Sequence, residues 1–160
     1  MSAAVNLDIT TDTNPDVVHD LNVLPWPFDS DRFQEVLMYD VLEHLQDVVA
    51  AMEEIHRVSQ NGAIVRISVP HFSSANTFTD PTHRHQFSVL SFNYFTGEHQ
   101  FSFYTRKRFR CRSAQIVFHP SLANKVIHRL ANHWKERYEQ RWAWMFPAWF
   151  IYTELEVIKP

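Results

Sequence analysis

The segment from Glu35 to Phe72 constrains the fold more than any other part of the chain, because it predicts a complete strand–helix–strand unit. Its apolar run, Val36 to Met38, is typical of a buried parallel strand. Apolar residues then recur at spacings of three and four from Val48 to Val58, which predicts an amphipathic helix. We expect Asn61-Gly62 to end this helix, with Gly62 as a left-handed cap, and Ala63 to Val69 to form a second, parallel strand.

Polar side chains follow the first of these strands, where it should leave the sheet. Tyr39 and Asp40 come directly after it, and ligands of α/β proteins bind outside the carboxyl ends of parallel strands. Glu43 and His44 are interpreted as residues at the start of the next helix, where a carboxylate favours the helix dipole. Chemistry is therefore expected close to Tyr39 and Asp40.

The other expected elements are short. Ser121 is predicted to cap a helix that runs through Arg141, with Val126, Ile127, Leu130 and Trp134 facing inward. A short helix is expected over Ser88 to Phe95, and strands over Phe101 to Tyr104, Arg110 to Phe118 and Phe150 to Ile158.

Composition limits the class of protein. With 160 residues, of which 45% are hydrophobic, the chain has enough apolar material for one globular core. A net charge of -3 gives no general reason to expect nucleic acid or a membrane as partner. The single Cys111 and the lack of an apolar spanning segment favour a cytoplasmic protein. The basic run Arg106 to Arg112 fits a strand with solvent-facing arginines better than a phosphate-binding patch.

The stretch PFDSDRFQEVLMYDVLEHL, the helix after it and EIHRVSQNGAIVRISVPHF together resemble the middle of a class I S-adenosylmethionine-dependent methyltransferase of type 11. Upstream, VNLDI resembles the second strand of that family and PDVVHDL its third. The resemblance implies an α/β, Rossmann-like methyltransferase sheet with a C-terminal antiparallel strand. We expect one domain over residues 1–160, with a cofactor-side half at 5–95 and C-terminal strands and a helix at 96–160.

The first strand of the family and its glycine-rich loop have no counterpart. The chain has only two glycines, Gly62 and Gly97, and neither precedes Asp8. Such a loop needs glycine because its backbone conformation excludes a Cβ. We therefore expect a domain truncated at the N-terminus, either a fragment or a shortened relative. Loss of this central strand predicts a rearranged sheet or a homodimer that covers the open edge.

The resemblance implies residues for the cofactor, S-adenosylmethionine. Asp8 corresponds to the acidic residue that accepts hydrogen bonds from the ribose, although it could instead cap loop amides. Asp20 and Leu21 correspond to the adenine contact, although Asp20 also suits a turn. Tyr39 and Asp40 lie where the fourth strand of the family ends under the cofactor.

A histidine-rich loop, PHFSSANTFTDPTHRHQF, allows three interpretations. His71, Asp80, His83 and His85 are residue types that bind zinc or iron, but their spacing does not favour a common metal. The resemblance places this loop over the substrate, where His71 or His83 would be the catalytic general base. The third interpretation is a set of hydrogen bonds that fix a long loop.

Two functions follow from these observations. The first is methyl transfer from S-adenosylmethionine to an oxygen or nitrogen of a small-molecule acceptor. The second is a catalytically silent domain of the same fold, which acts as a partner subunit or is a truncated product. Whether the chain is an enzyme stays open at this point, because a fold alone does not establish activity.

Overall fold

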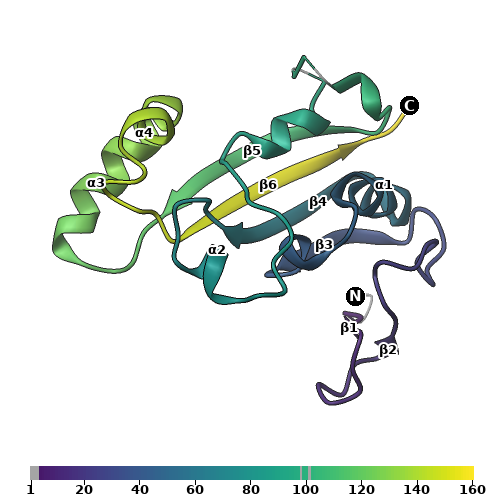
Figure 1. Ribbon diagram of the computed structural model, residues 1–160. Helices are drawn as coiled ribbons and strands as arrows, with labels where there is room; N and C mark the ends of the chain where they lie inside the picture. Colours follow the sequence, from purple (N-terminus) through teal and green to yellow (C-terminus); the bar gives the residue numbers. More distant parts are fainter. Residues whose placement is uncertain (1–3, 98, 101) are drawn as a thin grey trace.

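The computed structural model describes residues 4–97, 99–100 and 102–160, and its centre is a four-stranded sheet in the order β3-β4-β6-β5 (Figure 1). β3 (Phe33–Tyr39) runs parallel to β4 (Ser59–Pro70). β6 (Phe150–Ile158) is antiparallel to β4 on one side and to β5 (Arg108–Val117) on the other. The predicted α/β fold with a C-terminal antiparallel strand is confirmed.

Helix α1 (Val48–Val58) connects the two parallel strands, as its apolar period predicts. The carboxylate of Asp47 caps it by accepting a hydrogen bond from the Ala50 amide at 2.9 Å. Met52 and Ile55 are fully buried, as are Val65 and Ile67 of β4. Burial of these apolar side chains holds the helix on one face of the sheet.

The expected role of Gly62 as a helix cap is wrong. Helix α1 already ends at Val58, and Ser59 has an extended backbone. Gly62 has a φ of 80°, but it lies inside β4, where the register with β3 jumps from Phe33↔Ser59 to Glu35↔Ile64. The glycine therefore serves a bulge in the strand, for which its left-handed conformation is equally suited.

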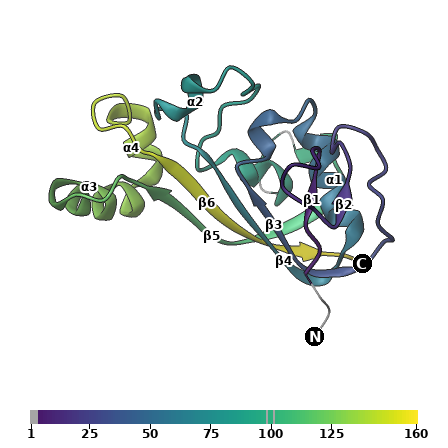
Figure 2. The same cartoon turned by 90° about the horizontal axis from the view of Figure 1, so that it is seen from below.

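The face of the sheet opposite helix α1 carries charged side chains. Helix α1 and the long loops cover only the first face (Figure 2). On the bare face, Arg66 pairs with Glu35 and with Glu154, the latter at 3.2 Å from Arg66 Nε. Glu156 pairs with Arg110 at 3.2 Å and with Arg112 at 2.7 Å. The arginines of β5 therefore face solvent, as expected, and make cross-strand ion pairs.

The first strands form a sheet of their own. β1 (Leu7–Asp8) and β2 (Val17–Val18) pair in parallel and do not join β3. The counterpart of the second family strand, β1, therefore does not pair with the counterpart of the fourth, β3. β3 is an edge strand of the larger sheet, and Leu37 and Tyr39 on it are 54% and 44% exposed.

The predicted C-terminal helix is two helices, α3 (Leu122–His133) and α4 (Lys135–Arg141), which break at Trp134. Ser121 caps the first of them, as predicted, by accepting a hydrogen bond from the Asn124 amide. Ile127 packs partly buried against the core, as expected, but the other three residues of the expected inward face, Val126, Leu130 and Trp134, are at least half exposed. Both helices project beyond the end of the sheet (Figure 1), which agrees with the exposure of that side of α3.

Short helical turns occupy the connections. They are η1 (Leu42–His44), α2 (Asn76–Thr79), η2 (Ser91–Phe95) and η3 (Ser102–Tyr104). The last replaces the strand expected over Phe101 to Tyr104, of which Phe101 lies outside the described residues. Within the described part of the chain, no helix combines the length and apolarity needed to cross a bilayer.

Candidate functional site

A cleft of about 520 Å³ opens at the carboxyl ends of β3 and β4. Position alone makes it a candidate site, because ligands of α/β proteins bind at this end of parallel strands. Its walls come from four segments: the turn after β3, the end of β4, the histidine-rich loop and the start of β6. The lining residues are Asp40, Glu43, His44, Pro70, Asn76, Thr79, Asp80, Pro81, His83 and Phe150.

Glu43 lies at the floor of this cleft and has no partner for its charge. The residue is only 1% exposed, and neither carboxylate oxygen accepts a hydrogen bond from the described residues. Burial raises the pKa of Glu43 to about 7, and the nearby carboxylates of Asp40 and Asp80 add to this effect. Such an unsatisfied buried carboxyl is uncommon in folded proteins and points to a function.

Two histidines stand beside Glu43. The rings of His44 and His83 lie 4.7 Å apart, edge to face. One ligand atom from each of Glu43, His44 and His83 lies within 4.8 Å of the other two. A buried carboxyl and two imidazoles are therefore gathered in one place, which suits either proton transfer or metal binding.

Hydrogen bonds fix the proton of each imidazole on Nδ1. His83 Nδ1 lies 3.3 Å from the carbonyl oxygen of Thr77, which can only accept. Thr82 donates its hydroxyl proton to Asp80 at 2.7 Å, so it accepts from His44 Nδ1 at 2.8 Å. In both histidines, Nε2 is then the nitrogen with a free lone pair for a proton or a metal.

Asp40 has an unusual backbone at the mouth of the cleft. Its φ is 55°, in the left-handed region that few residues other than glycine adopt. The Asp40 amide donates to the Ser68 carbonyl of β4 at 2.9 Å, which holds the turn in place. Burial raises the pKa of Asp40, although His44 and His83 act in the opposite direction. Backbone strain of this kind concentrates at functional sites.

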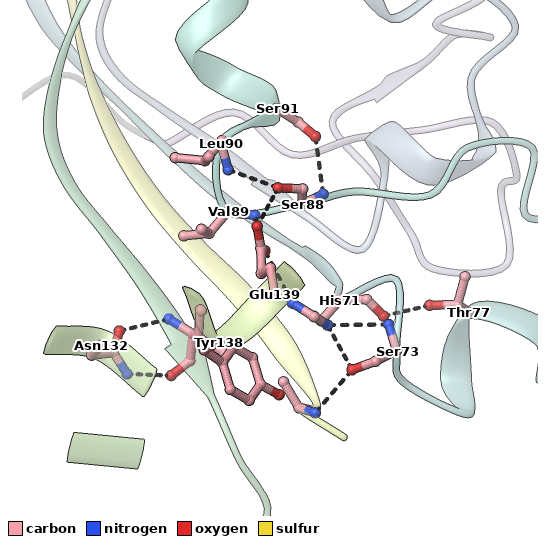
Figure 3. Close-up of polar contacts among 12 residues, drawn as sticks. His71, Ser73, Thr77, Ser88, Val89, Leu90, Ser91, Asn132, Tyr138 and Glu139 are labelled. Carbon is pink, nitrogen blue, oxygen red and sulfur yellow. Dashed lines mark hydrogen bonds and ion pairs between the residues drawn. The ribbon is translucent and has the colours of Figure 1, made fainter. Parts of the chain in front are cut away.

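His71 lies elsewhere, in a buried hydrogen-bond network (Figure 3). It is fully buried and receives the Ser73 amide on Nδ1 at 3.1 Å, so its proton is on Nε2 and points to Glu139 at 3.1 Å. Glu139 also accepts from the Ser88 hydroxyl at 2.6 Å and from the Val89 amide at 2.7 Å. His71 is not among the residues that line the cleft.

The metal set considered from the sequence is not brought together. His71 is held by Glu139, and His85 Nε2 is 2.9 Å from the Leu45 carbonyl oxygen. Asp80 accepts from the amide and hydroxyl of Thr82 at 2.8 and 2.7 Å. Among the four, only Asp80 and His83 line the cleft.

Comparison with known proteins agrees with this architecture. A family model described as "Methyltransferase domain" matches residues 3–67. A SAM-dependent methyltransferase of Archaeoglobus fulgidus has a similar fold, with a TM-score of 0.60 at 14% identity, over 94% of this chain and 74% of that one. YcgJ of Bacillus subtilis gives 0.58 at 13% identity, over 96% and 81%. The predicted resemblance to S-adenosylmethionine-dependent methyltransferases is confirmed.

A third similar structure contains a partner. It is a complex of the Haloferax volcanii Trm112 methyltransferase activator with a protein described as a methyltransferase, with a TM-score of 0.56 at 14% identity. The match covers 89% of this chain but only 61% of that one. No curated protein matches the sequence. At these identities the likeness shows the methyltransferase fold alone.

The residues expected to hold the methyltransferase cofactor lie in two places. Tyr39 is the last residue of β3, and its ring lies beside that of Tyr152, with the centroids 6.2 Å apart. Asp40 follows it and lines the cleft, whereas Tyr39 is not among the lining residues. Asp8 is the last residue of β1, and its two carboxylate oxygens accept from the Thr10 amide and the Thr13 hydroxyl, both at 3.0 Å. These bonds lower the pKa of Asp8. A turn role for Asp8 is thus visible, and its carboxylate would have to share or exchange these partners to bind a ribose.

The turn at Asp20 and Leu21 is attached to the segment behind the cleft. Asn22 donates to Asp20 from both its amide and its side chain at 2.9 Å. The Asn22 side-chain oxygen accepts from the Gln46 amide at 2.8 Å, two residues after His44. This bond places the turn next to the loop that leads out of the site.

Sequence reasoning missed Glu43 and His44 as site residues, since it assigned them to the start of a helix. They belong instead to the separate turn η1, which ends three residues before α1 caps at Asp47. The signal was nevertheless present: a carboxylate and a histidine side by side directly after a predicted parallel strand.

Proposed function

We propose that the chain is a methyltransferase domain that transfers a methyl group from S-adenosylmethionine to an oxygen or nitrogen of a small molecule. The observation that supports this most is the cleft at the carboxyl ends of β3 and β4, where Asp40 and the cluster of Glu43, His44 and His83 meet. Its volume, about 520 Å³, suits a small acceptor.

The reaction needs little from the protein beyond position and one proton acceptor. A lone pair of the acceptor attacks the methyl carbon while the carbon–sulfur bond breaks, and S-adenosylhomocysteine leaves. The acceptor then loses its proton, which the free Nε2 of His83 can receive. The Thr77 carbonyl keeps the other ring nitrogen protonated and so orients this base.

The cofactor would lie on the β3 side of the cleft. In this proposal Tyr39 and Asp40 form its base, and Asp20 and Leu21 approach from the turn that Gln46 holds. Asp8 accepts hydrogen bonds from the ribose hydroxyls once its hydrogen bond from the Thr13 hydroxyl is broken. His71 keeps the histidine-rich loop in place through Glu139 rather than acting on the acceptor.

Calorimetric titration with S-adenosylmethionine and S-adenosylhomocysteine tests the proposal. We expect micromolar binding that Asp40→Asn weakens at least about tenfold, while Asp12→Asn, an exposed residue of the β1–β2 connection, leaves it unchanged. With an accepted substrate, His83→Gln should slow the formation of S-adenosylhomocysteine by about a hundredfold without changing cofactor affinity. Absence of binding by the wild-type chain would overturn the proposal.

One observation favours the second function, a catalytically silent domain. The two glycines lie at the β4 bulge and beside Arg108, so neither is near the carboxyl end of β3, where the family loop would approach the cofactor. A silent domain would show no heat with either cofactor. It would gain binding only when another chain supplied the missing loop, which repeating the titration with a candidate partner protein can reveal.

We also propose that a second copy of the chain covers the open edge of β3. Leu37 and Tyr39 are exposed on this strand, and an apolar sheet edge is a template for pairing with another strand. Asp40, which lines the cleft, directly follows this strand. A homodimer formed through this edge would therefore shield the cofactor side of the site.

A further inference from the structure

The proposed methyl transfer assigns no role to the buried carboxyl of Glu43, which lines the same cleft. It is 1% exposed, and both of its oxygens lack a hydrogen bond from the described residues. A charged carboxylate in such a place is costly unless it is paired or coordinates a metal. Among the described residues nothing offsets this charge, so either a proton or a bound cation must compensate it.

The neighbours of Glu43 are those that a transition metal uses. One ligand atom of each of Glu43, His44 and His83 lies within 4.8 Å of the other two. Two imidazoles and one carboxylate form the three-ligand set of many catalytic zinc sites, which leave a further position open. Tetrahedral zinc holds its ligand atoms about 3.4 Å apart, so the side chains would draw together slightly on binding.

The surrounding hydrogen bonds prepare both imidazoles for this role. Metal-bound histidines usually donate their other ring N–H to a carbonyl or carboxylate, which fixes the tautomer and the ring orientation. His83 Nδ1 faces the Thr77 carbonyl, and His44 Nδ1 faces the Thr82 hydroxyl, which in turn donates to Asp80. Nε2 of each ring is left free to ligate.

We propose that Glu43, His44 and His83 bind a divalent first-row transition metal such as Zn²⁺ at the floor of the cleft, with a coordination position open towards the acceptor. The ion would bind the acceptor oxygen or nitrogen and hold it in line with the methyl donor. In that state His83 would be a ligand, and the ion would polarise the acceptor, whose proton would pass to solvent. Metal binding itself does not depend on methyl transfer.

Titration of the metal-free full-length chain with ZnCl₂, followed by calorimetry, tests this site. We expect each chain to bind one zinc ion tightly. The affinity for zinc should fall at least about tenfold in Glu43→Gln and in His83→Gln. The control is His133→Gln, an exposed histidine at the end of α3, which should bind zinc like the wild type. Circular dichroism of each metal-free variant shows that it is folded.

Cobalt provides a second readout that folding defects do not imitate. Co²⁺ in the same site should give the visible absorption of a tetrahedral ion, lost in His44→Gln and kept in His133→Gln. Zinc that binds equally to all variants would be adventitious binding to surface histidines and would overturn the inference, as would no binding by the wild type. Zinc binding without any binding of S-adenosylmethionine would support this site while contradicting the proposed methyl transfer.

Discussion

His71 and Glu139 connect two distant parts of the chain inside the protein. His71 Nε2 donates to Glu139 Oε1 at 3.1 Å, and the side chains of the two residues are 0% and 8% exposed. The first residue begins the histidine-rich loop after β4, and the second lies on α4. Because Ser88 and Val89 bond the same carboxylate, this contact fixes both ends of the loop that forms the outer wall of the cleft.

Removal of Glu139 should therefore destabilise the protein strongly. Glu139→Ala leaves the donors of His71, Ser88 and Val89 buried without an acceptor, which we expect to cost about 3 kcal/mol or more. Urea denaturation measures this change. Glu136→Ala, one turn earlier on α4 and exposed, is the matched control and should cost less than about 0.5 kcal/mol. Equal effects of the two substitutions would contradict a structural role for the network.

The same carboxylate predicts a loss of stability in acid. Burial would raise the pKa of Glu139, but hydrogen bonds from His71, Ser88 and Val89 outweigh it and lower the pKa below the ordinary value of 4.5. The unfolded chain then takes up the proton first, so the contribution of Glu139 is present above pH 4.5 and is lost as the pH falls through the folded pKa. The difference in the free energy of unfolding between the wild type and Glu139→Gln should shrink as the pH falls below 4.5. Urea denaturation at several pH values measures it.

Glu43 predicts the opposite dependence on pH. Its pKa is raised from 4.5 to about 7, so the folded state holds the proton more tightly than the unfolded chain. Stability therefore falls as the pH rises from about 4.5 to about 7. Compared with the wild type in a chelator, Glu43→Gln should be more stable by on the order of 3 kcal/mol at pH 8 and equal to it near pH 4. If Glu43→Gln instead destabilised the protein at pH 8, the carboxylate of Glu43 would have a stabilising partner and the prediction would be wrong.

The open edge of β3 predicts an oligomer that one substitution can dissociate. Leu37→Lys places a charge on the exposed apolar edge and should convert a dimer into a monomer in sedimentation velocity experiments. Gln115→Lys, an exposed residue of β5 at the opposite edge, should leave the dimer intact. A wild-type chain that sediments as a monomer at all concentrations would contradict the homodimer.

Regular elements of the fold were predictable because their sequence periods are strong. The alternation of Phe150 to Ile158 and the apolar period of α1 each gave an element close to its observed bounds. Parallel pairing of β3 with β4 followed from the connecting helix between them. Position-specific details were less predictable: Gly62 has the backbone expected of a cap but serves a bulge, because the strand started earlier than its apolar run.

Site residues were harder to find, since their environment depends on packing between distant segments. His71 and His83 look equivalent in sequence. Yet His71 is hydrogen-bonded to Glu139, 68 residues away, whereas His83 lines the cleft. Glu43 appeared as a helix-start residue because a carboxylate there is common. The three-dimensional structure, in which the loop brings Asp80 and His83 to the same cleft, is needed to see that Glu43 is buried with no hydrogen-bond partner for its carboxyl among the described residues.

The most direct test of the whole account is to locate cofactor binding on the chain. Amide chemical shifts of the labelled protein, followed by NMR during titration with S-adenosylhomocysteine, report each residue separately. If the cofactor binds at the cleft, saturable changes in amide chemical shift should cluster at Tyr39, Asp40 and the η1 turn, and at Asp20 and Leu21. The amide shifts of α3 should stay unchanged. Shifts confined to other surfaces, or none at saturating cofactor, would contradict the assignment of the cleft as the site of a methyltransferase.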